Sequence, residues 1–210
     1  MRPLVKICGL TRPEDARLAA ALGATHIGAV RTESSSRWVS AERARDVFAG
    51  AETDVETVFV FRDVPLNQVI RDAKLSGTMG VQLYGATDDD VRAVESEGFR
   101  VYRVYGMEED MTSLPKLDPP PTPDRPALLD VGGGGSGRRF DWALLGERAP
   151  AATFIAGGIR PDNVRALLKH RPYGIDLASG VESSPGVPGV PGVPGVKDAT
   201  KLRALFAEVS

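Results

Sequence analysis

The stretch that decides the fold of this chain is Tyr173-Gly-Ile-Asp-Leu-Ala-Ser-Gly-Val-Glu-Ser-Ser-Pro-Gly186. A short apolar run containing one carboxylate, Asp176, leads into a loop of small residues around Ser179 and Gly180. Small residues let backbone N–H groups approach an anion closely, as the binding of a phosphate ester requires. The segment therefore predicts a strand followed by a phosphate-binding loop.

A second segment of the same design lies upstream. Phe154-Ile-Ala-Gly-Gly158 is an apolar run that ends in Gly157 and Gly158 and precedes a predicted helix. Two successive units of this kind near a C-terminus are typical of a (β/α)8 barrel, whose phosphate site lies in the loops after strands seven and eight. We therefore expect Gly157, Gly158, Ser179 and Gly180 to surround a phosphate group.

The spacing of the apolar runs favours the same α/β fold. Eight short runs have the character of buried parallel strands: Leu4–Cys8, Thr25–Val30, Glu56–Phe61, Met79–Leu83, Arg100–Val104, Ala127–Asp130, Thr153–Ala156 and Gly174–Leu177. Their separations leave room for one loop and one helix per strand. So many units in one small domain favour a closed (β/α)8 TIM barrel over an open doubly wound sheet.

Helix signals lie between these runs. Thr11-Arg-Pro-Glu14 has the pattern of a capping box, and Gly23 is suited to end the helix that follows. Further helices are expected from Ser40 to Gly50, over Asp88–Glu97, from Pro161 onward, and over Ala199–Glu208 with Asp198 as its cap. The fifth and sixth units are weaker. Met107–Leu114 would be a short helix, and the proline-rich stretch Pro115–Pro126 is expected to be an extended loop.

Composition limits the possible functions. With 210 residues, of which 42% are apolar, residues 1–210 can form a single domain with one core. The net charge of -2 provides no basic field for nucleic acid, so the expected partner is a small phosphorylated molecule. A single cysteine and two histidines leave little material for a metal site, and we expect neither metal nor cofactor. No signal peptide and no apolar run of about 20 residues is present, which predicts a cytoplasmic protein without membrane contact.

Residues 185–196 are of a different kind, because they repeat Pro-Gly-Val four times. Four triplets are too few for a collagen-like triple helix. We interpret the repeat as a flexible or polyproline-like surface insertion in the loop after the last strand, created by tandem duplication. An interaction segment is the alternative.

Candidate catalytic residues lie at strand ends, where the catalytic groups of such barrels are found. Cys8 ends the first run before a glycine and should enter the pocket, although it could be only a small buried hydrophobe. Asp130 ends the sixth run before the glycine-rich segment Val131–Gly137, expected to be a mobile lid. Desolvation there would suit a general acid, although Asp130 could instead cap its own loop.

Two further charged residues have candidate roles. Asp176 should point inward, and a buried carboxylate needs a partner. Because the first and last strands of a closed barrel are neighbours, we predict that Asp176 pairs with Lys6. Arg37, beside Trp38 in the loop after the second run, has the planar fork that matches a carboxylate or phosphate, although most surface arginines are merely solvated.

Five motifs together resemble the phosphoribosylanthranilate isomerase family of tryptophan biosynthesis. They are Lys6-Ile-Cys-Gly-Leu-Thr-Arg-Pro-Glu-Asp-Ala16, Gly80-Val-Gln-Leu-Tyr-Gly85, Leu129-Asp-Val-Gly-Gly-Gly-Gly-Ser-Gly137 with Phe140-Asp-Trp142, Ala156-Gly-Gly158 with Pro161-Asp-Asn-Val164, and Asp176-Leu-Ala-Ser-Gly-Val-Glu-Ser-Ser-Pro-Gly186. The resemblance implies an Amadori rearrangement of N-(5-phosphoribosyl)anthranilate to 1-(2-carboxyphenylamino)-1-deoxyribulose 5-phosphate, without a cofactor. It leaves the oligomeric state open between monomer and homodimer.

The resemblance also implies individual roles. Asp130 is similar to the general acid of the family and Cys8 to its general base. Arg37 matches the arginine that holds the anthranilate carboxylate, and Asp176 matches a supporting carboxylate. The four small residues of the two glycine loops match the phosphate site.

Departures from the family pattern lie near the expected anthranilate site. Tyr84 replaces the histidine of the family, Gly28-Ala-Val-Arg31 replaces an aromatic-rich strand end, and the following loop lacks the usual proline. These changes predict weaker binding or altered selectivity. Two alternatives therefore stay open: the sister aldose–ketose isomerase of histidine biosynthesis, whose first strand would end in aspartate rather than Cys8, and a degenerate non-catalytic barrel.

Overall fold

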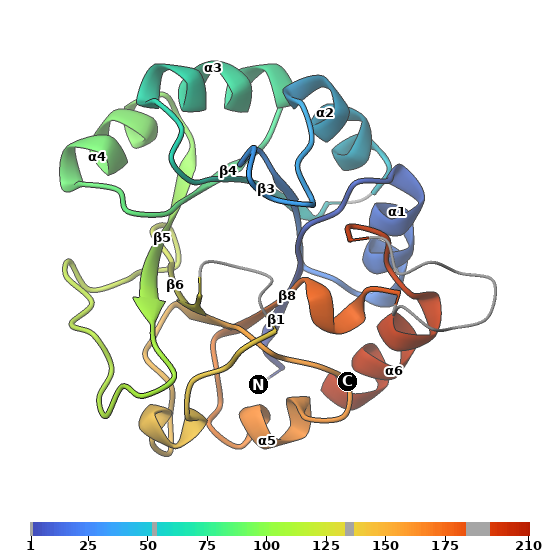
Figure 1. Cartoon of the computed structure of the whole chain (residues 1–210), viewed down its shortest axis with the longest axis vertical. Coiled ribbons are helices and arrows are strands. Elements are labelled where there is room, and N and C mark those ends of the chain that lie inside the picture. The colour runs from blue at the N-terminus through green and yellow to red at the C-terminus, as the bar shows by residue number, and fades with distance from the viewer. Residues whose placement is uncertain (1, 52–53, 133–136, 184–193) are drawn as a thin grey trace.

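The structure, a computed structural model, describes residues 2–51, 54–132, 137–183 and 194–210. Eight parallel strands pair in sequence order and close into a barrel, seen end-on in Figure 1. The strands are β1 (Leu4–Ile7), β2 (His26–Val30), β3 (Glu56–Phe61), β4 (Gly80–Leu83), β5 (Arg100–Met107), β6 (Ala127–Val131), β7 (Thr153–Ala156) and β8 (Gly174–Leu177). The predicted single-domain barrel is confirmed, and the strand bounds differ from the predicted ones by a few residues.

The barrel interior is filled by side chains that alternate along the strands. Tyr102, Phe154, Leu128 and Val58 are fully buried there. The rings of Tyr102 and Phe154 need glycine on the neighbouring strands, because a Cβ on Gly174 would lie 2.4 Å from Phe154. This apolar plug confines the polar side chains farther along the strands to the mouth of the barrel.

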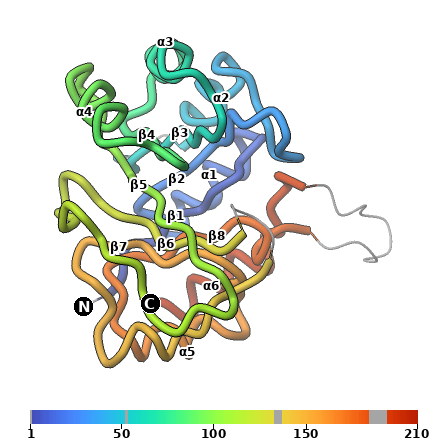
Figure 2. The backbone as a smooth tube through the Cα atoms, turned by 60° about the vertical axis from the view of Figure 1, so that its left-hand side comes forward, coloured from blue at the N-terminus to red at the C-terminus, as the bar shows by residue number. Residues whose placement is uncertain are grey.

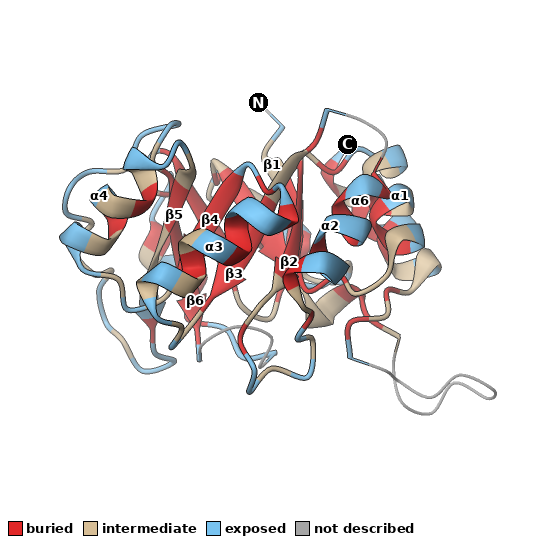
Figure 3. Cartoon of the chain, turned by 90° about the horizontal axis from the view of Figure 1, so that it is seen from above, coloured by how far each residue is buried: buried red, intermediate tan, exposed pale blue. Residues whose placement is uncertain are grey.

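Helices cover the outside of the barrel. They are α1 (Pro13–Leu22), α2 (Ala41–Ala49), α3 (Leu66–Ser76), α4 (Asp88–Ser96), α5 (Val164–Leu168) and α6 (Ala199–Val209), with the 3₁₀ turns η1 (Trp142–Leu145) and η2 (Ser179–Val181). Figure 3 shows their exposed outer faces and the buried strands that they enclose. The parallel strands are largely buried and apolar because helices cover one face and the barrel interior covers the other, with polar exceptions that include Lys6, Asp130 and Asp176.

Most predicted helix ends are confirmed. Ser40 caps α2 by accepting a hydrogen bond from Arg43, Asp198 caps α6, and Gly23 ends α1 with φ of 105°. The predicted capping box is wrong, because α1 has Arg12 as its N-cap without a side-chain cap. The Thr11 hydroxyl instead donates to the Gly195 carbonyl oxygen at 3.0 Å.

One side of the barrel has little helix. Figures 1 and 2 show α2, α3 and α4 along one side, whereas long loops follow β5 on the other. The predicted short helix over Met107–Leu114 is wrong, because β5 extends to Met107 and no helix follows. The expected loop over Pro115–Pro126 is confirmed, and α3 was not predicted. None of the helices in the described ranges is long and apolar enough to cross a membrane.

Two predicted features lie largely outside the described residues: the glycine lid at 133–136, and 185–193 of the Pro-Gly-Val repeat. The last copy of the repeat is described. Gly195, with φ of 87°, is packed so closely that a Cβ would lie 2.5 Å from Thr11, and Lys197 pairs with Glu182 in an antiparallel bridge. The final copy is therefore part of the packed structure.

Candidate active site

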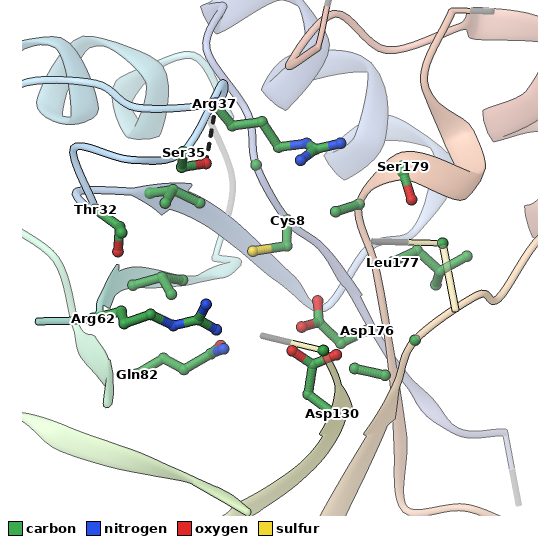
Figure 4. A pocket seen from close by; sticks show the side chains of 18 of the residues that line it. Cys8, Thr32, Ser35, Arg37, Arg62, Gln82, Asp130, Asp176, Leu177 and Ser179 are labelled. Atoms are coloured by element: carbon green, nitrogen blue, oxygen red, sulfur yellow. Dashed lines mark hydrogen bonds between the residues drawn. The ribbon is translucent and has the colours of Figure 1, made fainter. Parts of the chain in front are cut away.

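A cavity of about 280 Å³ opens at the carboxyl ends of the strands. All eight residues predicted for the site line it: Cys8, Arg37, Asp130, Gly157, Gly158, Asp176, Ser179 and Gly180. Figure 4 shows Cys8, Asp130 and Asp176 pointing into one space. The fold therefore brings together side chains that are widely separated in the sequence.

Lys6 and Asp176 form the ion pair that the sequence predicted. The register of β1 against β8 pairs these residues directly, and Lys6 Nζ donates to both carboxylate oxygens of Asp176 at 3.1 Å. Burial would lower the pKa of Lys6, but its interaction with the Asp176 carboxylate outweighs burial and raises the pKa above its ordinary value. Lys6 is therefore a fixed positive charge beneath the cavity.

Cys8 lies one residue beyond β1 and is held by a backbone hydrogen bond from its N–H to the Leu177 carbonyl oxygen at 2.8 Å. Glycine on β2 leaves space for it, because a Cβ on Gly28 would lie 2.9 Å from Cys8 Sγ. Burial raises the pKa of the Cys8 thiol, although the charge of Lys6 opposes the rise. The thiol is therefore protonated near neutral pH, and Lys6 stabilises its deprotonated form.

Asp130 receives a hydrogen bond from Tyr84, whose hydroxyl donates to Oδ2 at 2.7 Å. Burial raises the pKa of Asp130 to about 6, and the Tyr84 hydrogen bond opposes the rise. Behind this pair, Gln82 is almost fully buried, and its Oε1 has no partner among the described residues. A carboxyl group with a pKa near neutrality can donate a proton to a substrate at physiological pH.

The two glycine loops approach each other too closely for side chains. A Cβ on Gly180 would lie 1.8 Å from the Ile159 carbonyl oxygen. Gly158 is crowded by the segment after β6, because a Cβ there would lie 2.8 Å from the Gly137 carbonyl oxygen. Gly157 and Gly158 also have φ of 93° and 60°, which favours glycine. Glycine is therefore required for the bare concave wall that these loops form.

Arg37 lines the cavity, but its guanidinium is already engaged. Nε and Nη2 donate to the two carboxylate oxygens of Glu182, each at 2.7 Å. Glu182 also accepts from Lys197 Nζ at 3.1 Å and from the Gly195 N–H at 2.9 Å. Burial would raise the pKa of Glu182, but the hydrogen bond from Arg37 and the charge of Lys197 outweigh it and lower the pKa to about 2.

Sequence reasoning missed Arg62 and Gln82 as pocket residues and Glu182 as the partner of Arg37. Strand alternation could have revealed the first two, since Arg62 continues the inward-facing series of Val58 and Val60. Glu182 carried no comparable local signal, because Arg37 lies 145 positions away. Within the described ranges, no group of three or more His, Cys, Asp or Glu side chains could hold a metal ion.

Fold and site together define a (β/α)8-barrel enzyme equipped for acid–base chemistry. A family model described as N-(5'phosphoribosyl)anthranilate (PRA) isomerase matches residues 5–208. The chain therefore belongs to the PRA isomerase family, whose members are isomerases of tryptophan biosynthesis. The first-choice assignment from the sequence is thus confirmed over the two alternatives.

Individual relatives agree with this assignment. The N-(5'-phosphoribosyl)anthranilate isomerase of Rubrobacter xylanophilus is 38% identical, over 87% of this chain and 91% of its own. The crystal structure of the phosphoribosyl anthranilate isomerase from Thermus thermophilus has a TM-score of 0.78 and 36% identity, with 98% of each chain covered. Another phosphoribosyl anthranilate isomerase was solved in complex with reduced 1-(o-carboxyphenylamino)-1-deoxyribulose 5-phosphate. It has a TM-score of 0.77 and 26% identity, covering 99% of this chain and 98% of its own.

Proposed function

We propose that this protein converts N-(5'-phosphoribosyl)anthranilate into 1-(2-carboxyphenylamino)-1-deoxyribulose 5-phosphate, with Asp130 as the general acid and Cys8 as the general base. The observation that carries these roles is their meeting in one cavity, where the pKa of Asp130 is about 6 and Lys6 lies beside the thiol. The relative in complex with the reduced product supports this substrate class.

The first step opens the ribose ring. Asp130 donates its proton to the ring oxygen as the bond from that oxygen to C1 breaks, and the lone pair of the anilino nitrogen forms the C1–N double bond. The second step removes the proton on C2 by the Cys8 thiolate. The electrons of the C2–H bond form a C1–C2 double bond and neutralise the iminium, and the resulting enolamine tautomerises to the aminoketone product. Atoms and charge balance without a redox partner.

The productive state has a proton on Asp130 and none on Cys8. Near neutral pH the dominant state is the reverse one, in which Asp130 is ionised and Cys8 is protonated. Both states carry one proton on the pair, so the dominant state converts into the productive state without net proton uptake. Lys6 favours the thiolate, and Asp176 supports the reaction by fixing Lys6 at 3.1 Å.

The cavity also binds the two charged groups of the substrate. Backbone N–H groups around Gly157, Gly158, Ser179 and Gly180 hold the phosphate. Arg37 contacts the anthranilate carboxylate through Nη1, which has no hydrogen bond among the described residues, while Glu182 fixes its opposite edge. We further propose that the protein acts in the cytoplasm as a monomer or homodimer.

The function is tested by following anthranilate fluorescence while the wild-type protein consumes N-(5'-phosphoribosyl)anthranilate made in situ. Catalytic loss of the substrate with one equivalent of 1-(2-carboxyphenylamino)-1-deoxyribulose 5-phosphate is the expected result. Absence of turnover at saturating substrate would overturn the proposal.

A further inference from the structure

The proposed substrate carries negative charge at both ends, a phosphate on the ribose and a carboxylate on the aromatic ring. The glycine loops that follow β7 and β8 are the phosphate end of the cavity. In a ring of eight strands, β3 lies across the barrel from β7. A cation at the end of β3 would therefore face the opposite end of a bound substrate.

Arg62 occupies this position. It follows β3 directly, and it continues the series of inward-facing residues that includes the buried Val58 and Val60. It lines the cavity, and Figure 4 shows its side chain extending toward Asp130 and Cys8. Its guanidinium carbon lies 4.1 Å from the centre of the Tyr84 ring. Because Tyr84 is held by its hydrogen bond to Asp130, the guanidinium stacks on a fixed surface.

Neighbouring arginines form ion pairs with carboxylates, but Arg62 forms none within the described ranges, although its charge acts on Asp130. The fork of Arg37 is engaged by Glu182, and Arg31 donates to Asp72 of α3 at 2.8 Å, outside the barrel. No hydrogen bond or ion pair joins Arg62 to any described residue, and its guanidinium stacks on the Tyr84 ring instead. Its donors therefore remain available to a ligand.

From this arrangement we infer that Arg62 is a specificity-determining residue, which binds the carboxylate of the substrate's aromatic group through its guanidinium fork. The inference rests on the proposed function and adds a second cation to Arg37. The geometry of a guanidinium matches both oxygens of a carboxylate, and stacking on Tyr84 fixes its plane. The unpaired Oε1 of Gln82 lines the same cavity and offers an acceptor for a substrate N–H or O–H.

Binding rather than turnover gives the sharpest test. Calorimetry would compare two stable ligands, the reduced product 1-(2-carboxyphenylamino)-1-deoxyribitol 5-phosphate and its analogue without the carboxyl group. Arg62→Met keeps most of the side-chain bulk but removes the fork. We expect it to weaken binding of the carboxylated ligand by roughly 10- to 100-fold and to change binding of the other by less than about threefold.

Control variants show whether the loss of affinity is caused by removing the contact between the Arg62 guanidinium and the carboxylate of the ligand. Arg31→Met removes a cation outside the cavity and should leave both affinities unchanged, whereas Arg62→Lys should give a smaller but still carboxylate-selective loss. Arg62→Lys also decides the question if Arg62→Met does not fold. Equal losses for both ligands, or a selective loss in Arg37→Met alone, would overturn the inference. A wild-type protein that binds neither ligand would overturn the proposed function, and this inference with it.

Discussion

At the residue scale, the proposed chemistry depends on two groups whose pKa values are displaced upward by burial. The pKa of Asp130 is about 6, and the pKa of Cys8 lies above its ordinary value. Below the first pKa both groups are protonated, and above the second both are ionised, so neither extreme contains the productive state. We therefore expect kcat/KM to rise with pH near 6, to reach a plateau, and to fall again at the pKa of the thiol.

Tyr84 provides a test of this pH profile. Its hydrogen bond stabilises the ionised form of Asp130, so Tyr84→Phe should raise the pKa of Asp130. The rising limb of kcat/KM should then move to higher pH, which pH-dependent steady-state kinetics would measure. A limb that stays in place would mean that Tyr84 does not set the ionisation of Asp130.

Element by element, the strands could be predicted because each is a short apolar run between turn residues, and both faces of a barrel strand are buried. The segments after β5 and β6 could be predicted only in part. Proline excludes a helix over Pro115–Pro126, and that loop is predicted correctly, whereas the helix predicted over Met107–Leu114 is wrong because β5 continues to Met107. After β6, η1 has too few residues for an amphipathic period. The false capping box has a tertiary cause. Thr11 has the right spacing to Glu14, but its hydroxyl is bound to Gly195, a residue from the other end of the chain.

The contact between the two glycine loops predicts the effect of Gly180→Ala. The new Cβ would lie 1.8 Å from the Ile159 carbonyl oxygen, so the loops must move apart. We expect weaker binding of inorganic phosphate as a competitive inhibitor and a loss of stability of about 1–3 kcal/mol. Gly106→Ala is a suitable control because its Cβ would meet nothing within 4 Å. Unchanged phosphate inhibition in Gly180→Ala would argue against a phosphate site at these loops.

The repeat can be tested by shortening. Deleting three Pro-Gly-Val copies leaves one, whose glycine can take the anchored place of Gly195 between Thr11 and Glu182. Loop-closure entropy changes slowly with length, so the free energy of unfolding should stay within about 1 kcal/mol of wild type, with turnover retained. In contrast, Gly195→Ala should destabilise the protein. Denaturant titration would compare the free energy of unfolding of the deletion variant with that of Gly195→Ala. Equal losses in the two variants would contradict the claim that the final copy is anchored in the packed structure.

On the scale of the whole molecule, the sequence sufficed to predict the barrel and the eight residues that meet in its cavity. The ion pair of Lys6 with Asp176 could also be predicted, because closure makes β1 and β8 neighbours. The engagement of Arg37 by Glu182 could not, since it joins two loops whose relative position depends on the complete fold. Local patterns identified which residues face the cavity mouth, but not which of them pair with one another.

At the scale of the whole molecule, His26 contributes a loss of stability in mild acid. Asp130 opposes this loss, because its raised folded pKa of about 6 lets the folded state take up a proton before the unfolded state does. Burial lowers the pKa of His26 to about 3, so the folded state stays unprotonated where an unfolded histidine, with a pKa of about 6.5, takes up a proton. Through His26, unfolding is therefore favoured progressively as the pH falls from 6.5 toward 3. Glu182 adds a loss below its unfolded pKa of about 4.3, since its folded pKa is about 2. Urea titrations of His26→Leu between pH 7 and 5 should show a flatter dependence than wild type, and parallel curves would contradict this assignment.

Turnover of Cys8→Ala and Asp130→Asn, measured with the same fluorescence assay beside wild type, tests the central claim most directly. Each substitution removes one of the two proposed proton-transfer groups while leaving the phosphate loops intact. We predict that kcat falls by at least about 100-fold in each variant with little change in KM, because proton-transfer groups act mainly in the transition state. More than about a tenth of wild-type kcat in either variant would contradict the acid–base assignment for that residue.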